Sequence, residues 1–132
     1  VKYGSNELLD TILSGSDDFS VRLWDIRSDQ QIQVFNGHSN AVMCVEYSPF
    51  VIKNSIGDSN VICSGSSDNT IRFWDVRSNK SELYMIKGNK KEDYGIYCLK
   101  FIRLKKKEKT KNGTYDLNLC YGLSKGPIHT WG

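Results

Sequence analysis

One twelve-residue stretch occurs twice in this chain and constrains its fold more than any other feature. Residues 14–25 read Ser-Gly-Ser-Asp-Asp-Phe-Ser-Val-Arg-Leu-Trp-Asp, and residues 64–75 read Ser-Gly-Ser-Ser-Asp-Asn-Thr-Ile-Arg-Phe-Trp-Asp. A third, divergent copy closes the chain at residues 121–132 as Tyr-Gly-Leu-Ser-Lys-Gly-Pro-Ile-His-Thr-Trp-Gly. Because internal self-similarity is the signature of repeat architectures, we expect the chain to consist of copies of one structural unit.

The repeated unit is about 44 residues long once insertions are set aside. The tryptophans that end the three copies, Trp24, Trp74 and Trp131, lie 50 and 57 residues apart. The additional residues fall outside the motif, chiefly in the segments that lead into the second and third copies. Three triplets upstream of the motifs also align, at residues 1–3, 45–47 and 99–101. Length therefore changes between the predicted elements and not within them.

Short strands joined by tight turns are predicted along the whole chain. Residues 20–24 and 31–35 alternate polar and apolar side chains, which is the period of a half-buried strand. Further strands of the middle unit are predicted at residues 41–47, 60–63 and 82–86. Ser48 and Pro49 should end the first of these and leave residues 49–59 as a connection. No stretch has sustained helical periodicity, so we predict an all-β chain of antiparallel four-stranded units.

This arrangement resembles the WD-repeat β-propeller family. Its motifs stand at the family's spacing, with Gly37-His38 before the first strand of the complete unit, Asp68 on its tight turn and Trp74-Asp75 ending its third strand. In that family each repeat forms one sheet, or blade, and the blades are arranged radially around a central channel. The resemblance covers nearly the whole chain and implies an incomplete propeller, an open arc of about three blades.

The resemblance divides the chain into three WD repeats. The first, residues 1–36, lacks most of its first strand; the second, residues 37–87, is complete; the third, residues 88–132, is degenerate and lacks its last strand. Propellers typically have four or more blades. We therefore expect bare strand edges at both ends of the arc, and self-association through them, because exposed edges pair with other chains.

The family pattern implies a hydrogen-bonded set in the middle unit, made by His38, Ser64, Asp68 and Trp74. A buried indole N–H needs an acceptor, and a serine hydroxyl can accept from it while donating to a histidine ring nitrogen. The other ring nitrogen can donate to a carboxylate. Each polar group then has a partner, which offsets the cost of burying it.

The other two units keep this set only in part. The first unit has Ser14, Asp18 and Trp24 but no histidine. The third keeps Trp131, with tyrosine at the serine position and Lys125 at the aspartate position. A histidine, a serine and an aspartate could also form a hydrolase triad, but no G-x-S-x-G elbow accompanies them. We therefore predict a structural network in a protein that is not an enzyme.

A second recurring pattern is Trp-Asp-x-Arg, which places Arg27 and Arg77 two residues after the Trp-Asp pairs. It resembles the box by which some WD-repeat propellers dock onto a cullin-type ubiquitin-ligase adaptor. The alternative is that each arginine pairs with a local carboxylate, such as Asp25 or Asp75, or points into water. The sequence leaves both interpretations open.

Positive charge is concentrated in one segment. Residues 103–111 hold six positive charges and one glutamate, so they are net +5 in a chain that is net +3 overall. A solvated loop is the favoured interpretation. Nucleic acid is not a favoured partner because no aromatic residues are interleaved with these lysines.

The four cysteines lie in apolar runs without CxxC spacing, which favours buried free thiols over a zinc site or a disulfide framework. Reduced thiols indicate an intracellular location, cytoplasmic or nuclear. No run approaches the length of a membrane span, and no signal peptide is visible. No cofactor or metal is implied. We predict a scaffold that binds other proteins or peptides in a multiprotein assembly, with a ubiquitin-ligase substrate receptor as the alternative.

Overall fold

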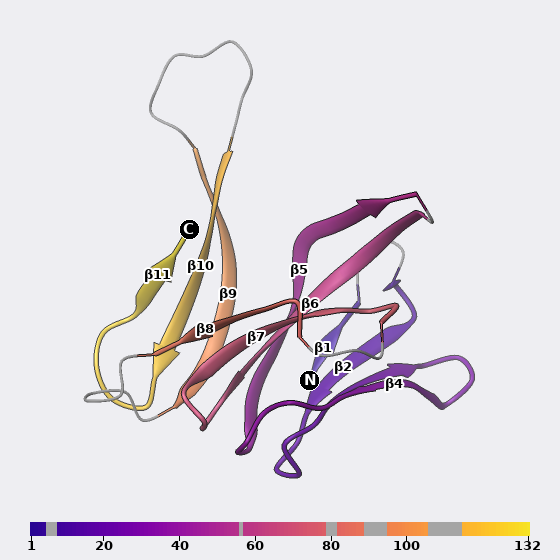
Figure 1. Ribbon diagram of the computed structural model, residues 1–132, viewed down its shortest axis with the longest axis horizontal. Helices are drawn as coiled ribbons and strands as arrows, with labels where there is room; N and C mark the ends of the chain where they lie inside the picture. The colour runs from indigo at the N-terminus through magenta and orange to yellow at the C-terminus, as the bar shows by residue number, and fades with distance from the viewer. Residues whose placement is uncertain (5–7, 56, 79–81, 89–94, 106–114) are drawn as a thin grey trace.

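The computed structural model describes residues 1–4, 8–55, 57–78, 82–88, 95–105 and 115–132 (Figure 1). Eleven β-strands account for all the regular elements of these segments. They form three separate antiparallel sheets that do not close into a ring. The predicted all-β class and its four-stranded antiparallel units are therefore confirmed. Within the described residues, no helix is long and apolar enough to cross a membrane.

The sheets follow one another along the chain. The first contains β1 (Lys2–Tyr3), β2 (Thr11–Gly15), β3 (Val21–Asp25) and β4 (Gln30–Phe35). The second contains β5 (Val42–Asn54), β6 (Gly57–Ser66), β7 (Thr70–Asp75) and β8 (Tyr84–Lys87). The third contains β9 (Ile96–Lys105), β10 (Tyr115–Leu123) and β11 (His129–Trp131). Each sheet is a meander, because short turns can join only antiparallel neighbours.

The β5–β6 hairpin is longer than the sequence predicts. The expectation that Ser48 and Pro49 end the strand is wrong, because β5 continues to Asn54 and β6 already begins at Gly57. Pro49 is tolerated because β5 is an edge strand and its pairing register with β6 shifts around this proline. A proline at such an irregularity removes no ladder hydrogen bond.

The β9–β10 hairpin also reaches further than expected. Residues 103–105 belong to β9, so the start of the predicted lysine-rich loop is strand. Pairing with β10 runs from Ile96, opposite Leu123, to Lys105, opposite Tyr115. The remainder of the predicted loop, residues 106–111, lies outside the described residues.

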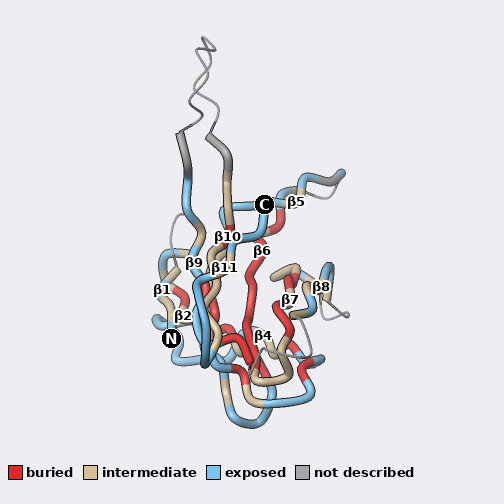
Figure 2. Tube along the Cα trace, turned by 90° about the vertical axis from the view of Figure 1, so that its left-hand side faces the viewer, coloured by how far each residue is buried: buried red, intermediate tan, exposed pale blue. Residues whose placement is uncertain are grey.

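The middle sheet buries both of its faces. One face carries Ile62 and Trp74 and packs against the apolar residues of the first sheet. The other carries Cys63 and Ile71 and packs against the third sheet. Successive side chains of a strand point to opposite faces, so a strand covered on both sides is apolar at consecutive positions. Figure 2 shows the resulting concentration of buried residues along β6 and β7.

Each outer sheet leaves one face uncovered. On the first, Ile12 and Trp24 lie opposite one another on β2 and β3 and stay partly exposed. On the third, Cys98 is exposed and Ile102 is 40% exposed. The prediction of bare strand edges at both ends is thus corrected. The sheets pack face to face, so the uncovered surface at each end is a sheet face.

Candidate functional site

Three hydrogen bonds link four buried side chains of the middle sheet. The Trp74 indole donates to Ser64 Oγ over 2.9 Å, and Ser64 Oγ lies 2.7 Å from His38 Nε2. His38 Nδ1 lies 2.8 Å from Asp68 Oδ2. Ser64 and Trp74 are at most 1% exposed, and the side chains of His38 and Asp68 are 0% and 4% exposed. The structure thus brings together the four residues that the family pattern implies.

Strand pairing explains how these residues meet. Ser64 on β6 lies opposite Arg72 on β7, which is two residues before Trp74. The Trp74 side chain therefore has to extend only two residues back along β7 to bring its indole to Ser64. Asp68 lies in the turn between the two strands, where its carboxylate accepts the backbone N–H groups of Ser39 and Thr70. These bonds fix the carboxylate in front of the segment that carries the histidine.

The available donors determine the protonation of the network. An indole can only donate, so Ser64 Oγ accepts from Trp74 and donates its own proton to His38 Nε2. The ring proton of His38 is then on Nδ1 and is donated to Asp68. Burial lowers the pKa of His38 below 6.5, against the opposing effect of the Asp68 carboxylate. The network therefore contains a neutral imidazole at neutral pH.

The carboxylate of Asp68 remains ionised although it is buried. Burial alone would raise its pKa, but hydrogen bonds from Thr70, Ser39 and His38 outweigh this effect and hold the pKa below 3.8. Hydrogen bonds to the charged form of an acid favour that form. Asp68 thus acts as a fixed acceptor for two backbone donors and two side chains.

The network extends further than the sequence interpretation proposed. Thr70 Oγ1 donates to Asp68 Oδ1 over 2.6 Å and lies 3.2 Å from His38 Nδ1. Arg72 Nη1 lies 3.2 Å from Glu82 Oε1, and both side chains are largely buried. A signal was available, because a hydroxyl residue and an arginine stand four and two residues before the tryptophan in both complete motifs.

The first sheet has a shorter version of this arrangement. The Trp24 indole donates to Ser14 Oγ over 3.0 Å. In the adjacent turn, the hydroxyl of Ser20 and the guanidinium of Arg22 both bind Asp18. Hydrogen bonds, first from the Ser20 side chain, lower the pKa of Asp18 to about 2. Among the described residues no histidine joins the two parts, so the serine and the aspartate stay in separate groups.

The third sheet replaces the network with ring contacts. Tyr121 occupies the serine position and stacks on His129, with ring centroids 5.4 Å apart and an interplanar angle of 17°. Trp131 contacts Phe73 and Tyr84 of the middle sheet, at centroid distances of 6.2 and 5.9 Å. Trp131 therefore packs the third sheet on the middle one although the polar residues of its motif have changed.

The geometry argues against nucleophilic chemistry at the histidine, serine and aspartate. Ser64 is 0% exposed, and its hydroxyl is engaged by both Trp74 and His38. A catalytic serine has to face a substrate together with an oxyanion site. In the described part of the chain, no cluster of three or more His, Cys, Asp or Glu side chains could hold a metal ion.

Comparison with known proteins identifies the family. The model of the WD domain, G-beta repeat, matches residues 4–25 and 29–75, which together make up more than half of the chain. The chain belongs to the WD40 family. The two matched segments contain both copies of the Trp-Asp motif and the whole polar network of the middle sheet up to Asp75.

Several WD40 relatives match short parts of the chain. The "WD repeat-containing protein pop1" of Schizosaccharomyces pombe is 43% identical over 37 residues, which are 28% of this chain and 5% of that protein. "Transcription initiation factor TFIID subunit 5" of Caenorhabditis elegans is 42% identical over 38 residues, 29% of this chain and 6% of that protein. The chain spans only a small part of the length of these relatives.

A solved WD40 structure has the same fold. The crystal structure of the WD40 beta propeller domain of Doa1 superposes with a TM-score of 0.65 at 20% sequence identity. The superposition covers 92% of this chain and 33% of that one. At this identity the likeness establishes the arrangement of the sheets and nothing more specific.

The arginines of the two WD40 Trp-Asp-x-Arg motifs are exposed but differ in their surroundings. The backbone N–H of each donates to the carboxylate two residues earlier, over 2.8 and 2.9 Å. The side chain of Arg27 pairs instead with Asp10, at 2.9 Å, and is 78% exposed. The guanidinium of Arg77 lies beside the backbone of Gly57 on the β5–β6 hairpin.

The cysteines of this WD40 chain are all free, but not all are buried. Cys63 is fully buried, and burial raises the pKa of its thiol. Burial likewise raises the pKa of Cys44 to about 12. Cys98, predicted to be buried, is exposed because no further sheet of the described residues covers its face.

Proposed function

We propose that this chain is part of a non-catalytic WD-repeat scaffold that mediates protein–protein interactions in a multiprotein assembly. The observation that carries this proposal is the closed polar network of the middle sheet. Its histidine, serine and aspartate are buried and bonded to one another, so they stabilise the fold and contact no substrate. Function is then left to the surfaces around this network, which include the turns, the hairpins and the uncovered faces of the outer sheets.

Those surfaces are suited to protein partners. Among the exposed large apolar side chains are three that are 44% to 50% exposed, namely Phe19, Phe50 and Leu83. Aromatic and aliphatic anchors of this kind are typical of binding hot spots. The free thiols support an intracellular location. The name of one relative, a TFIID subunit, describes a member of a larger assembly.

Cross-linking mass spectrometry on the protein in cells tests this proposal. We expect lysines of this segment, such as Lys53, Lys87 and Lys100, to be cross-linked to a reproducible set of proteins. The same protein carrying Trp74→Ala, which should disrupt the middle sheet, is the control and should lose these cross-links. Absence of protein cross-links, or hydrolase activity that Ser64→Ala abolishes, would contradict the scaffold role.

A second candidate is the substrate receptor of a cullin-type ubiquitin ligase. It is supported by the exposure of Arg27 and Arg77 at equivalent positions of two consecutive repeats. A guanidinium binds a carboxylate through two parallel hydrogen bonds, which suits recognition of one partner surface by both arginines. This remains the narrower of the two proposals because Arg27 already pairs with Asp10.

The double variant Arg27→Ala with Arg77→Ala separates the two candidates. Exposed ion pairs contribute little to folding, so the midpoint of thermal unfolding should stay nearly unchanged. If the receptor proposal is correct, recovery of the ligase adaptor in a pull-down should be lost, whereas Lys87→Ala should leave it intact. Unchanged adaptor recovery in the double variant would remove this candidate and leave the general scaffold.

A further inference from the structure

A cavity of about 360 Å³ opens between β5 and β9, where the second and third sheets meet. One wall follows the irregular part of β5 around Ser48 and Pro49, and the opposite wall is formed by Lys100, Phe101 and Arg103 of β9. The pairing register of β5 with β6 shifts between Tyr47 and Val51, and an irregularity of this kind bends a strand locally. The volume falls at the lower end of the range of about 300–1,000 Å³ found for ligand sites.

The charged residues around this cavity are unequally paired. Among the described residues of its lining, Glu46 is the one carboxylate, and its side chain is 13% exposed. Lys2 approaches this carboxylate from β1, with Nζ 3.4 Å from Oε2. Lys100 and Arg103 are exposed and have no carboxylate partner among the described residues. Once Glu46 and Lys2 are counted together, two positive charges remain at the cavity.

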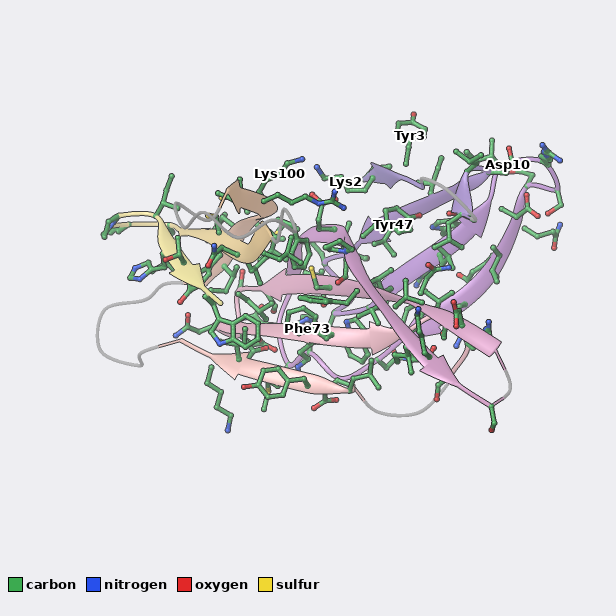
Figure 3. The ribbon with its side chains drawn as sticks, turned by 90° about the horizontal axis from the view of Figure 1, so that it is seen from above. Lys2, Tyr3, Asp10, Tyr47, Phe73 and Lys100 are labelled. Atoms are coloured by element: carbon green, nitrogen blue, oxygen red, sulfur yellow. The ribbon has the colours of Figure 1, made fainter. Side chains whose placement is uncertain are left out.

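Three of the charged residues near the cavity lie on strands at one edge of each sheet. Lys2, Glu46 and Lys100 are the middle residues of the three aligned triplets, so they occupy equivalent positions on β1, β5 and β9. Figure 3 shows the side chains of Lys2 and Lys100 extending toward one another from these strands. Lys2 neutralises Glu46, and the positive charge of Lys100 is left in excess.

The uncharged part of the lining combines apolar side chains with polar ones. Val61, Phe101 and Leu117 are among its apolar residues, and Asn60 and Ser48 supply an amide and a hydroxyl. A ligand that fits this lining has an aliphatic stem and an anionic head. The side chain of an aspartate or a glutamate has this composition, and Arg103 can hold its carboxylate through two hydrogen bonds.

We propose that this cavity docks an acidic side chain, aspartate or glutamate, of an extended segment of a protein partner. The proposal rests on the scaffold function and specifies the chemistry of one of its partners. A nucleic acid fits the site less well. Stacking needs accessible rings, whereas Phe101 is partly buried and the hydroxyl of Tyr47 is held by Thr11 at 2.8 Å.

A fluorescein-labelled hexaglutamate peptide is the probe that tests the site. Its fluorescence anisotropy is measured against the complete 132-residue chain at low ionic strength, where exposed charges are least screened. The double variant Lys100→Gln with Arg103→Gln should weaken binding about tenfold or more, because it removes two charge-assisted bonds. Circular dichroism verifies that each variant keeps its β structure.

Two further variants make the test specific. Lys53→Gln with Lys87→Gln removes the same charge from positions outside the cavity lining, and should change the affinity less than about twofold. Glu46→Gln removes the one carboxylate of the lining and should tighten binding. If both double variants weakened peptide binding equally, the binding would depend only on the net charge of the chain, and this would overturn the proposal.

The remaining outcomes are also decisive. No binding of hexaglutamate by the folded chain would overturn the proposal. A six-residue single-stranded uridine RNA that binds more tightly than the peptide, and loses its binding in Lys100→Gln with Arg103→Gln, would assign the site to nucleic acid instead. Absence of cellular cross-links in the unsubstituted protein, together with peptide binding by the folded chain, would count against the scaffold and not against this site.

Discussion

The first and middle sheets carry almost the same motif, yet they bury it to different depths. Trp24 and Trp74 each donate to the serine ten residues earlier. Trp74 is 1% exposed, and His38 extends its network to Asp68. Trp24 stays partly exposed, and its sheet lacks a histidine. The motif therefore specifies a local hydrogen bond, whereas the neighbouring sheets decide how far that bond is removed from water.

This difference has an energetic consequence. A polar group that loses its partner costs little where water can replace the partner and costs most where water has no access. The middle sheet is covered on both faces, so its network should be sensitive to the loss of any member. The first sheet has an uncovered face, so equivalent substitutions there should be milder.

The largest contrast is expected for the two tryptophans. Trp74→Ala removes a buried ring that also contacts Phe35 at a centroid distance of 5.8 Å, and should lower the free energy of unfolding by about 3–5 kcal/mol. Trp24→Ala should cost clearly less because its ring is already partly in water. Urea denaturation of both variants measures the difference. Equal losses would mean that the uncovered face of the first sheet is protected in solution.

The next contrast concerns the aspartates. Asp68→Ala leaves a buried histidine N–H and two backbone N–H groups without their acceptor, and should cost about 1–3 kcal/mol. Asp18→Ala should have a smaller effect because that side chain is 48% exposed. Thermal unfolding of the two single variants and of the double variant also tests whether the effects add. A larger loss for Asp18→Ala would contradict the ranking by burial.

A smaller effect should appear as a loss of stability below pH 6.5, which arises in the middle sheet because His38 lies there. The pKa of His38 is lowered below 6.5 by burial, so the unfolded chain takes up the proton first. Stability from this group is complete above pH 6.5 and declines as the pH falls from there toward the lower pKa of the folded state. Asp68 adds a second decline below pH 3.8 because its folded pKa is also lowered.

The variant His38→Gln isolates the first decline. It should be less stable than the parent chain at neutral pH, and its midpoint of urea denaturation should change less between pH 7 and pH 5. Asp68 remains in this variant, so the decline below pH 3.8 should persist in part. A parent chain whose midpoint rises as the pH falls below 6.5 would show that the protonated imidazole is the form that folding favours.

The motif residues were predictable because their chemistry is local. A tryptophan ten residues after a serine, with an aspartate in the intervening turn, reports two adjacent strands of one hairpin. Pro49 misled the strand assignment because a proline ends a central strand but is tolerated at an irregular edge. The exposure of Cys98 could not be predicted from the sequence, since it depends on whether another sheet covers its face. The cavity at Glu46 depends likewise on how two sheets meet.

The three turns that precede the third strands offer the smallest and most local comparison. Phe19, Asn69 and Gly126 occupy the same position in the three copies, and all have positive φ, of 73°, 64° and 114°. Glycine adopts this region freely and asparagine tolerates it, whereas a phenylalanine is strained there. Phe19 is 44% exposed, so its ring recovers little of that strain by packing. The first turn is therefore less well suited to its conformation than the other two.

Replacing Phe19 by the residue of the middle repeat should stabilise the chain. Phe19→Asn should raise the free energy of unfolding by about 1 kcal/mol, because asparagine accepts left-handed backbone at low cost. The reverse change, Asn69→Phe, should lower it by a similar amount or more, since Asn69 also lies close to Gly88. Urea denaturation measures both. A loss of stability in Phe19→Asn would mean that the exposed ring makes a favourable contact in solution that outweighs the strain of its backbone.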